Sequence, residues 1–270
     1  MAAQTALAEL REEAHTSVSA ITTYIQCPKK YELSYLQRVP PSHRPVALSL
    51  GAALHQALAL FYSHIRSTDS EMSKSELVEH FSRAWKAQLE SPVPTLLDDK
   101  ETEKSVEEKG AALLGAFHDL APRPHRVIEI EMPFSVELVN PDSGEVLPVR
   151  MVGVFDAVVQ DADGKYTILE HKSAARRWSE DRLAFDHQLT CYTLAGTACG
   201  LGDVRVSVQL LLKQKVPTLE IYQPTRTDDD RRDFLRLVCG VLKAIEANAF
   251  WAKRDWFCRT CPWAGPCLTG

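Results

Sequence analysis

VGVFDAVVQDADGKYTILEHKS, residues 152–173, predicts two neighbouring strands at the centre of a sheet. Apolar residues lie on both sides of DADG, residues 161–164, which is typical of a tight turn between antiparallel strands. Side chains two residues apart on a strand point to the same face, so Glu170 and Lys172 project together. The turn brings Asp156, on the preceding strand, within reach of Glu170. The segment therefore predicts two carboxylates and one ammonium on one patch.

Such a patch is costly to form unless a cation joins the two carboxylates. Carboxylate oxygens suit Mg²⁺ or Mn²⁺, and a divalent ion could polarise a phosphodiester and lower the pKa of a bound water. An ordinary solvated strand face with an ion pair is the alternative, and the short pattern alone favours it. The apolar residues that lead into Asp156 and Glu170 instead place them at the ends of buried strands, where α/β folds bind ligands.

The remaining periodicity predicts a helical preface followed by a sheet. Residues 17–39 are typical of two short helices with a break at Pro28, and residues 47–65 of a strongly apolar helix. A charged helical pattern over 67–120 indicates an inserted helical lobe. Strands are predicted at 126–139, 146–160, 165–173, 203–213 and 218–223. Helices are predicted at 179–199 and 228–250. The expected fold is an α/β sandwich around a mixed sheet.

Composition sets outer limits on function. The 270 residues are 45% hydrophobic and 25% charged, which is ordinary for a globular protein, and the net charge of −5 excludes a polycation. A nucleic-acid site must then be a local basic surface. We expect no apolar run long enough to cross a bilayer and no signal peptide, hence a cytoplasmic protein without a membrane partner. In that reducing compartment, seven cysteines favour buried thiols or metal ligands over disulfides.

Three of those cysteines end the chain in FCRTCPWAGPCLTG, residues 257–270. Cysteines amid proline, glycine and tryptophan are not typical of a core helix or strand, so we expect a metal site that needs a fourth ligand from elsewhere. Four thiolates suit either Zn²⁺ or an iron–sulfur cluster. Cys191, Cys199 and Cys239 fall within helical patterns and are expected to be packing thiols.

Three further residues could serve the carboxylate patch. Gln188 and Tyr192 are four apart and share one helix face; they could bind a phosphate oxygen or position the lysine, and the tyrosine could stack on a base. A half-buried core tyrosine is the alternative. His55 lies on an apolar helix, where a lone histidine is more often a core residue than a ligand. It becomes a candidate ligand only if that helix lies over the sheet edge.

Six segments, in this order, carry a family resemblance: CPKKYELSYL, GAALHQAL, VGVFDAVV, ILEHKS, HQLTCY and CRTCPWAGPC. The sequence resembles the RecB-like exonuclease branch of the PD-(D/E)XK nuclease superfamily. More narrowly, it looks like the iron–sulfur members, which include AddB-type nuclease domains and the CRISPR-associated adaptation exonuclease. The resemblance implies a single nuclease domain with a restriction-endonuclease-like core. Its expected parts are N-terminal helices at 16–66, the helical lobe at 67–120, the core at 121–250 and a cysteine segment at 251–270.

The resemblance also implies residue roles. The implied metal ligands are His55, Asp156, Glu170 and the backbone carbonyl of His171. Lys172 becomes the catalytic lysine, and Gln188 and Tyr192 become its supporting helix motif. Glu131 matches an acidic position that some members use near the metal, although Glu129 is close enough in sequence to compete for that role.

For the cysteines, the resemblance implies a [4Fe–4S] cluster. Cys27 matches the lone upstream cysteine of the family pattern, and it would complete the site formed by Cys258, Cys261 and Cys267. Spacing alone still allows Zn²⁺. Because Cys27 lies near the start of the chain, the cluster would tie the two ends together as a staple.

The implied activity is a metal-dependent DNA exonuclease that uses Mg²⁺ or Mn²⁺ and acts on single-stranded or frayed ends. Recombination or repair with a separate helicase, and CRISPR spacer processing with the adaptation proteins, are both compatible roles. A catalytically silent DNA-binding or assembly module is one alternative, which the intact metal and lysine set disfavours. A zinc-stabilised scaffold without nucleic-acid activity is the other, and a brown colour with visible absorbance would exclude it. Arg176, Arg177 and Trp178, directly after the active strand, could hold a DNA strand by phosphate contact and stacking.

Overall fold

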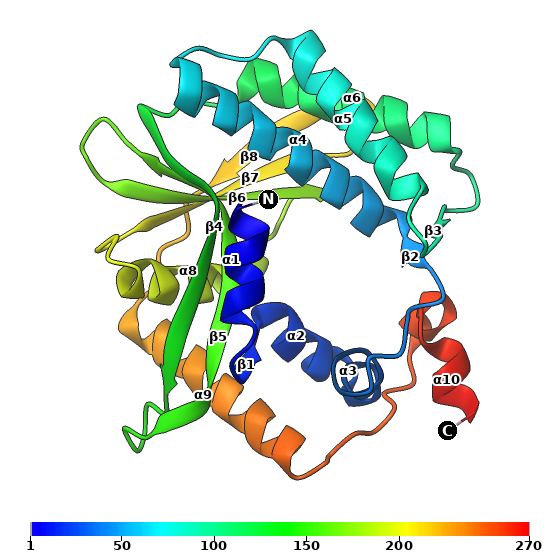
Figure 1. Ribbon diagram of the computed structural model, residues 1–270, viewed down its shortest axis with the longest axis vertical. Coiled ribbons are helices and arrows are strands. Elements are labelled where there is room, and N and C mark those ends of the chain that lie inside the picture. Colours follow the sequence, from blue (N-terminus) through cyan, green and yellow to red (C-terminus); the bar gives the residue numbers. More distant parts are fainter. Residues whose placement is uncertain (1, 270) are drawn as a thin grey trace.

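The computed structural model describes residues 2–269 and consists of a mixed sheet with helices on both faces (Figure 1). The sheet strands are β1 (His15–Thr16), β4 (Arg126–Val139), β5 (Val146–Gln160), β6 (Tyr166–Ala174), β7 (Arg205–Leu212) and β8 (Thr218–Tyr222). Strand β4 runs along one edge of β5, whereas β1 and β6 pair with different parts of the other edge. The pairs β4–β5, β5–β6 and β7–β8 are antiparallel, and β6–β7 is parallel. The predicted mixed α/β sheet is confirmed.

The helices divide into two layers, each with its own hydrophobic core. One layer holds α4 (Val46–Thr68), α5 (Lys74–Leu89) and α6 (Glu103–Leu120), and the other holds α2 (Val18–Gln26), α8 (His187–Ala198) and α9 (Asp228–Glu246). The remaining elements are α1 (Ala2–Leu10), α3 (Pro28–Tyr31), the π-helical turn Glu32–Leu36, α7 (Glu180–Ala184), the 3₁₀ turn Trp256–Thr260, α10 (Ala264–Thr269), and the small strand pair β2 (Arg44–Pro45) and β3 (Thr95–Leu96). Residues 67–120 thus contribute a packed layer over one face of the sheet.

Helix α4 is long and apolar enough to cross a membrane, judged by length and composition alone, so the expectation that no run reaches this length was wrong. Half of the most apolar stretch of α4 is buried inside the protein. Leu54, Leu58 and Phe61 pack in the core that α4 shares with α5, α6 and the sheet. The apolar character of α4 is therefore that of a core helix.

One predicted helix is divided in two. A single helix was expected over 179–199, but α7 ends at Ala184 and α8 begins at His187. Asp186 separates them because its carboxylate accepts the backbone N–H groups of Gln188 and Leu189, at 3.0 and 3.1 Å, as an N-cap. The break leaves Phe185 between the helices.

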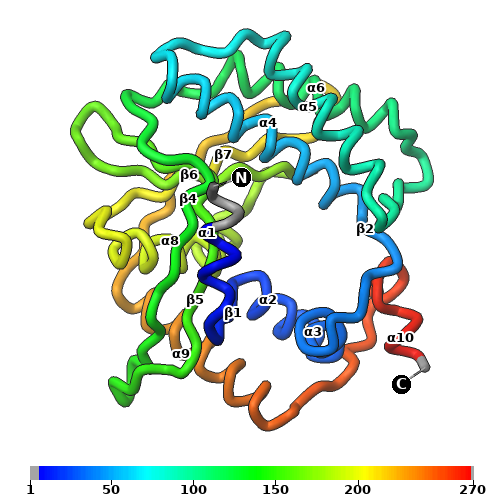
Figure 2. Tube along the Cα trace, viewed as in Figure 1, coloured from blue at the N-terminus to red at the C-terminus, as the bar shows by residue number. Residues whose placement is uncertain are grey.

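The C-terminal segment that ends in α10 lies beside α3 and the loop that follows it (Figure 2). Hydrogen bonds join the C-terminal segment to α2, α3 and the loop after them: Tyr24 OH to Ala249 O (2.7 Å), Lys29 N to Trp251 O (3.0 Å), Ser42 Oγ to Pro262 O (2.9 Å) and Trp263 Nε1 to Val39 O (2.8 Å). Because all four acceptors are backbone carbonyls, these hydrogen bonds fix the main-chain path of the C-terminal segment.

Candidate active site

The site begins where the β5–β6 ladder ends. The last registered pair is Ala157 with Leu169, so the next position would set Asp156 opposite Glu170. There the strands part, because the carboxylate of Asp156 accepts the backbone N–H of His171 at 2.8 Å in place of a ladder bond. On its other side β6 stays paired with β7. Both carboxylates thus lie where the two strands of the hairpin separate, Asp156 on β5 and Glu170 on β6, and β6 is a central strand of the sheet.

Helix α4 passes over this edge and brings His55 to the first carboxylate. His55 Nδ1 lies 3.1 Å from Asp156 Oδ1. Burial lowers the pKa of His55, but the charge and hydrogen bond of Asp156 outweigh it and the net pKa is raised. For the Asp156 carboxyl, burial raises the pKa, but the interactions with His55 and His171 lower it by more. The net effect is a lowered pKa of Asp156. The condition set by the sequence for His55, a helix over the sheet edge, is met.

Glu170 is the most buried charge of the site, with 1% of its surface exposed. Its Oε1 forms an ion pair with the Lys172 ammonium, and the Tyr192 hydroxyl lies close enough to lower the pKa of Glu170 as well. Burial and the nearby charge of Asp156 raise the pKa of Glu170 to about 7, and Lys172 offsets only part of this. A carboxylate so poorly satisfied gains from a cation.

A chain of hydrogen bonds anchors the lysine. Lys172 Nζ donates to Gln188 Oε1 (2.9 Å), Gln188 Nε2 donates to Tyr192 OH (2.8 Å), and that hydroxyl donates to Val154 O (3.0 Å). Burial lowers the pKa of Lys172, but Glu170 outweighs burial, so the pKa is raised and the amine stays charged. Gln188 and Tyr192, both on α8, therefore connect the lysine to the backbone of β5.

The side chains of Tyr192 and His171 are both buried, so neither ring is placed to contact a substrate. Tyr192 is 3% exposed and packs edge-on to Phe155, with ring centroids 5.0 Å apart, so the suggestion that it stacks on a base was wrong. The imidazole of His171 is buried and stacks on Tyr62, and burial lowers its pKa to about 4. Only the backbone of His171 faces the carboxylates.

The acidic candidates on β4 also separate. Glu129 forms a bidentate ion pair with Arg66. Glu131 is exposed and lies between the registered pairs Ile130–Ala157 and Met132–Phe155, opposite Asp156, with a left-handed φ of 48°. Because Arg66 occupies Glu129, Glu131 is the better candidate for a role beside the metal.

The donor set fits a hard divalent cation, although it is not closed around one. Within residues 2–269, no three His, Cys, Asp or Glu side chains already converge as a metal site. At the sheet edge, the Lys172 ammonium holds Glu170 instead. The under-satisfied oxygens of Glu170, the anionic Asp156 and the imidazole of His55 are nevertheless ligands of the kind that Mg²⁺ and Mn²⁺ accept. A pocket of about 290 Å³, lined by His55, Lys172 and residues of α4 including Leu48, opens beside them.

The basic segment after β6 differs from expectation. Trp178 is 6% exposed, with the Arg182 guanidinium 4.1 Å above its ring, so the stacking role expected for Trp178 was wrong. Arg177 pairs with Glu220. Phe185 is exposed instead, a position that the sequence analysis missed because it assumed an unbroken helix. The signal that could have found it is Asp186, an N-cap residue in the middle of that helix.

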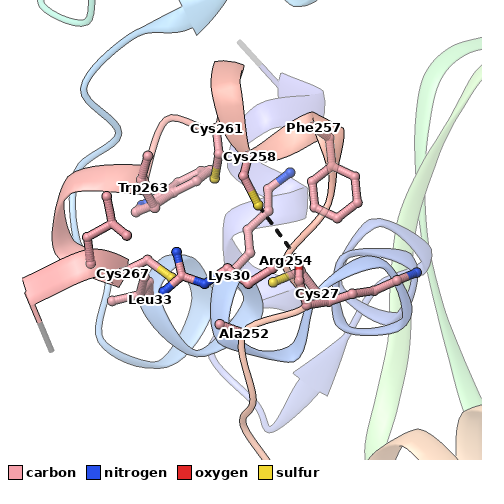
Figure 3. A pocket seen from close by; sticks show the side chains of 13 residues that line it. Cys27, Lys30, Leu33, Ala252, Arg254, Phe257, Cys258, Cys261, Trp263 and Cys267 are labelled. Atoms are coloured by element: carbon pink, nitrogen blue, oxygen red, sulfur yellow. Dashed lines mark hydrogen bonds between the residues drawn. The ribbon is translucent and has the colours of Figure 1, made fainter.

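The four candidate cluster cysteines line one cavity of about 70 Å³ (Figure 3). Cys27 comes from the junction of α2 and α3, and Cys258, Cys261 and Cys267 come from the C-terminal segment. Lys30 and Arg254 line the same cavity. Four thiols are the donors that such a cluster requires, although in this structure they line the cavity without converging on one point. All seven cysteines are free thiols, and burial raises the pKa of Cys191, in α8, to about 12.

Known proteins share this fold. The family model for the PD-(D/E)XK nuclease superfamily matches residues 15–268. Among solved structures, a protein of Eubacterium rectale described as "Putative exonuclease" has a TM-score of 0.54 at 12% identity, covering 95% of this chain and 88% of that chain. The structure of SSO0001 has a TM-score of 0.41 at 13% identity over 93% of this chain and 94% of that one, a likeness too loose to carry an argument. A search of curated proteins found no match.

The likeness to the Eubacterium rectale protein shows the fold alone, because the identity is low. The family match is broader evidence, since it runs from β1 to α10 and includes both carboxylate strands. Because that match covers nearly the whole sequence, the chain belongs to the PD-(D/E)XK nuclease superfamily.

Proposed function

We propose that this nuclease is a DNA exonuclease that depends on Mg²⁺ or Mn²⁺ and acts on single-stranded or frayed ends. One observation carries the proposal: Glu170 is buried beside Asp156, and within residues 2–269 the Lys172 ammonium is the one cation that pairs with it. A binding module gains nothing from a buried carboxylate beside a second, partly buried one, because each costs free energy to desolvate. A hydrolase that holds a cation and a charged lysine at the same point gains both.

The residues that would hold the ion are His55, Asp156, Glu170 and the backbone carbonyl of His171. When bound, the ion polarises the phosphodiester and lowers the pKa of a water. The Lys172 ammonium supplies a fixed positive charge for the charge that develops on the phosphate, or orients the water. Gln188 holds that ammonium in place through its hydrogen bond to Tyr192.

Cleavage of end-labelled DNA tests this proposal. Single strands and duplexes with a 5′ or 3′ label are incubated with and without Mg²⁺ or Mn²⁺, using the wild type, Lys172→Ala and a control, Lys165→Ala. Lys165 is exposed in the turn of the same hairpin. We expect metal-dependent shortening from one end, lost in Lys172→Ala and kept in Lys165→Ala. Binding without cleavage under all conditions would instead support the silent module, and wild-type cleavage by Lys172→Ala would show that the active site lies elsewhere.

We also infer that the four-cysteine cavity holds a [4Fe–4S] cluster with a structural role. Support comes from the four thiols around one cavity, the two adjacent cations and the family resemblance. Iron and sulfide analysis of anaerobically purified protein decides the matter. One equivalent of zinc with no iron would keep the four-sulfur site but exclude the cluster.

The cellular role that we propose is end processing in recombination or repair, together with a separate helicase, or the trimming of CRISPR spacers with adaptation proteins. Seven free thiols fit the cytoplasm, where thiols stay reduced. The identity of the neighbouring genes separates the two roles, since one predicts a helicase gene and the other predicts spacer-acquisition genes.

A further inference from the structure

A second pocket is linked to the catalytic lysine through Gln188, which lines the pocket and accepts a hydrogen bond from Lys172. It has a volume of about 310 Å³ and lies between α2 and the turn that joins α7 to α8; its wall includes Ser19, Thr22, Arg182, Phe185, His187 and Gln188. We call it the Phe185 pocket. Gln188 accepts the hydrogen bond from Lys172, and Lys172 in turn lines the pocket beside His55. The two pockets therefore flank the Lys172–Gln188 hydrogen bond, and a strand laid across the lysine would reach both.

Phe185 has an unusual position for a large apolar side chain, with 75% of its surface exposed. Its backbone is held firmly. Its N–H donates to Asp181 O at 2.9 Å, and Arg226 donates to the carbonyls of Leu183 and Asp186 on either side of it, at 2.6 and 3.4 Å. An aromatic ring presented to solvent on a fixed backbone is suited to stack on a planar group without a large loss of entropy.

Arg182 supplies the polar half of the pocket. Its guanidinium carbon lies 4.1 Å from the centroid of the Trp178 ring, so the indole covers part of the guanidinium and fixes its place. Within the described residues, no carboxylate forms an ion pair with it. The single carboxylate of the described pocket wall, Asp186, is engaged by two amides of α8 through Oδ1. An oriented, unpaired guanidinium is a good bidentate donor to a phosphate.

We propose that the Phe185 pocket holds the nucleotide next to the scissile phosphate of a single DNA strand, with the base stacked on Phe185 and a phosphate bound by Arg182. The inference rests on the proposed nuclease function and specifies its substrate site. A base within a duplex is already stacked and paired, so it can lie on Phe185 only after the end frays. The pocket would thus select single strands over duplexes.

Binding measured without metal tests the pocket independently of catalysis. Fluorescence anisotropy of a labelled oligo(dT) strand in EDTA is compared for the wild type, Phe185→Ala, Phe185→Trp and Leu120→Ala. Leu120 is a matched control because it is 52% exposed at the end of α6 and lines none of the pockets described above. We expect Phe185→Ala to weaken binding about 5- to 100-fold, as loss of one stacked base does, whereas Phe185→Trp and Leu120→Ala stay near the wild type. Arg182→Ala should weaken binding and reduce its dependence on salt by about one phosphate contact.

A strand with one abasic site makes the kinetic test specific to stacking. The wild type should slow at one position relative to the abasic site, because the missing base cannot stack there, and Phe185→Ala should lose this pause. Circular dichroism checks that the variant is folded. Wild-type binding by Phe185→Ala together with an unchanged pause would overturn the inference while leaving the nuclease intact. If the wild type cuts no DNA under any metal condition, the proposed function fails, and the anisotropy series still decides whether the pocket binds a strand.

Discussion

Tyr192→Phe removes one oxygen atom from the middle of the network that holds the catalytic lysine. The tyrosine hydroxyl accepts the N–H of Gln188 at 2.8 Å and donates to Val154 O at 3.0 Å. The ring is buried and packs edge-on to Phe155, and phenylalanine keeps that contact. The substitution therefore tests the two hydrogen bonds with little change in packing.

The expected loss follows from those two bonds. Each contributes about 1 kcal/mol net, and both bonds are partly buried, so we expect a loss of about 2 kcal/mol in the free energy of unfolding. With a urea dependence of about 3 kcal/mol per molar for a chain of this size, the urea midpoint should fall by roughly 0.7 M. Without the hydroxyl, the amide of Gln188 can turn and stop holding Lys172. Loss of that position should slow cleavage by about 10- to 100-fold.

Urea unfolding followed by circular dichroism measures the first effect, and single-turnover cleavage with saturating Mn²⁺ measures the second. Tyr166→Phe is the matched control, because no hydrogen bond of the Tyr166 hydroxyl occurs within the described residues. Combined with Gln188→Ala, Tyr192→Phe should have less effect than it has alone, since both act on one network. A variant with the wild-type urea midpoint and the wild-type rate would refute the claim that this network positions Lys172.

Three further outcomes are expected. Glu170→Ala should reduce Mn²⁺ affinity at least tenfold in titration calorimetry because it removes an anionic ligand, and an unchanged affinity would exclude Glu170 from the metal site. Cys261→Ser should give colourless protein with a lower melting temperature, whereas Cys239→Ser should keep both colour and stability; equal behaviour of the two would contradict the cluster assignment. Gly153→Ala should cost about 1–3 kcal/mol in thermal unfolding, because its Cβ would lie 2.4 Å from a phenylalanine ring of β4, while Gly240→Ala, with open space around it in α9, should not destabilise the protein.

Local patterns were sufficient for most of the sheet. The strands predicted at 126–139 and 146–160 have the same bounds as β4 and β5. They could be predicted because the alternation of apolar and polar residues along a strand is a local sequence pattern. The superfamily was also accessible from short motifs in a characteristic order, and the family match confirmed it, whereas the narrower RecB-like, iron–sulfur branch stays a prediction. The roles of the individual site residues stay predictions.

Burial of single aromatic residues was not accessible in this way. Trp178 follows the active strand and was expected to contact DNA, but it packs under Arg182, whereas Phe185 is exposed. Both outcomes depend on where α7 ends and on how Arg226 holds the turn, which involves residues about 40 positions apart. Periodicity within a window of residues carries no information about such contacts.

The amino-acid sequence alone determined the chemical groups of this protein: a glutamate and a lysine two residues apart on one strand, an aspartate across the turn, and cysteines at both ends. Tertiary structure decided which groups meet. It set His55 of α4 on Asp156, 101 residues away, placed Lys172 on the helix amide of Gln188, and brought Cys27 to the cavity of the terminal cysteines. These contacts join distant segments, and their geometry arises when two helical layers pack on opposite faces of one sheet, a property of the whole chain rather than of any motif within it.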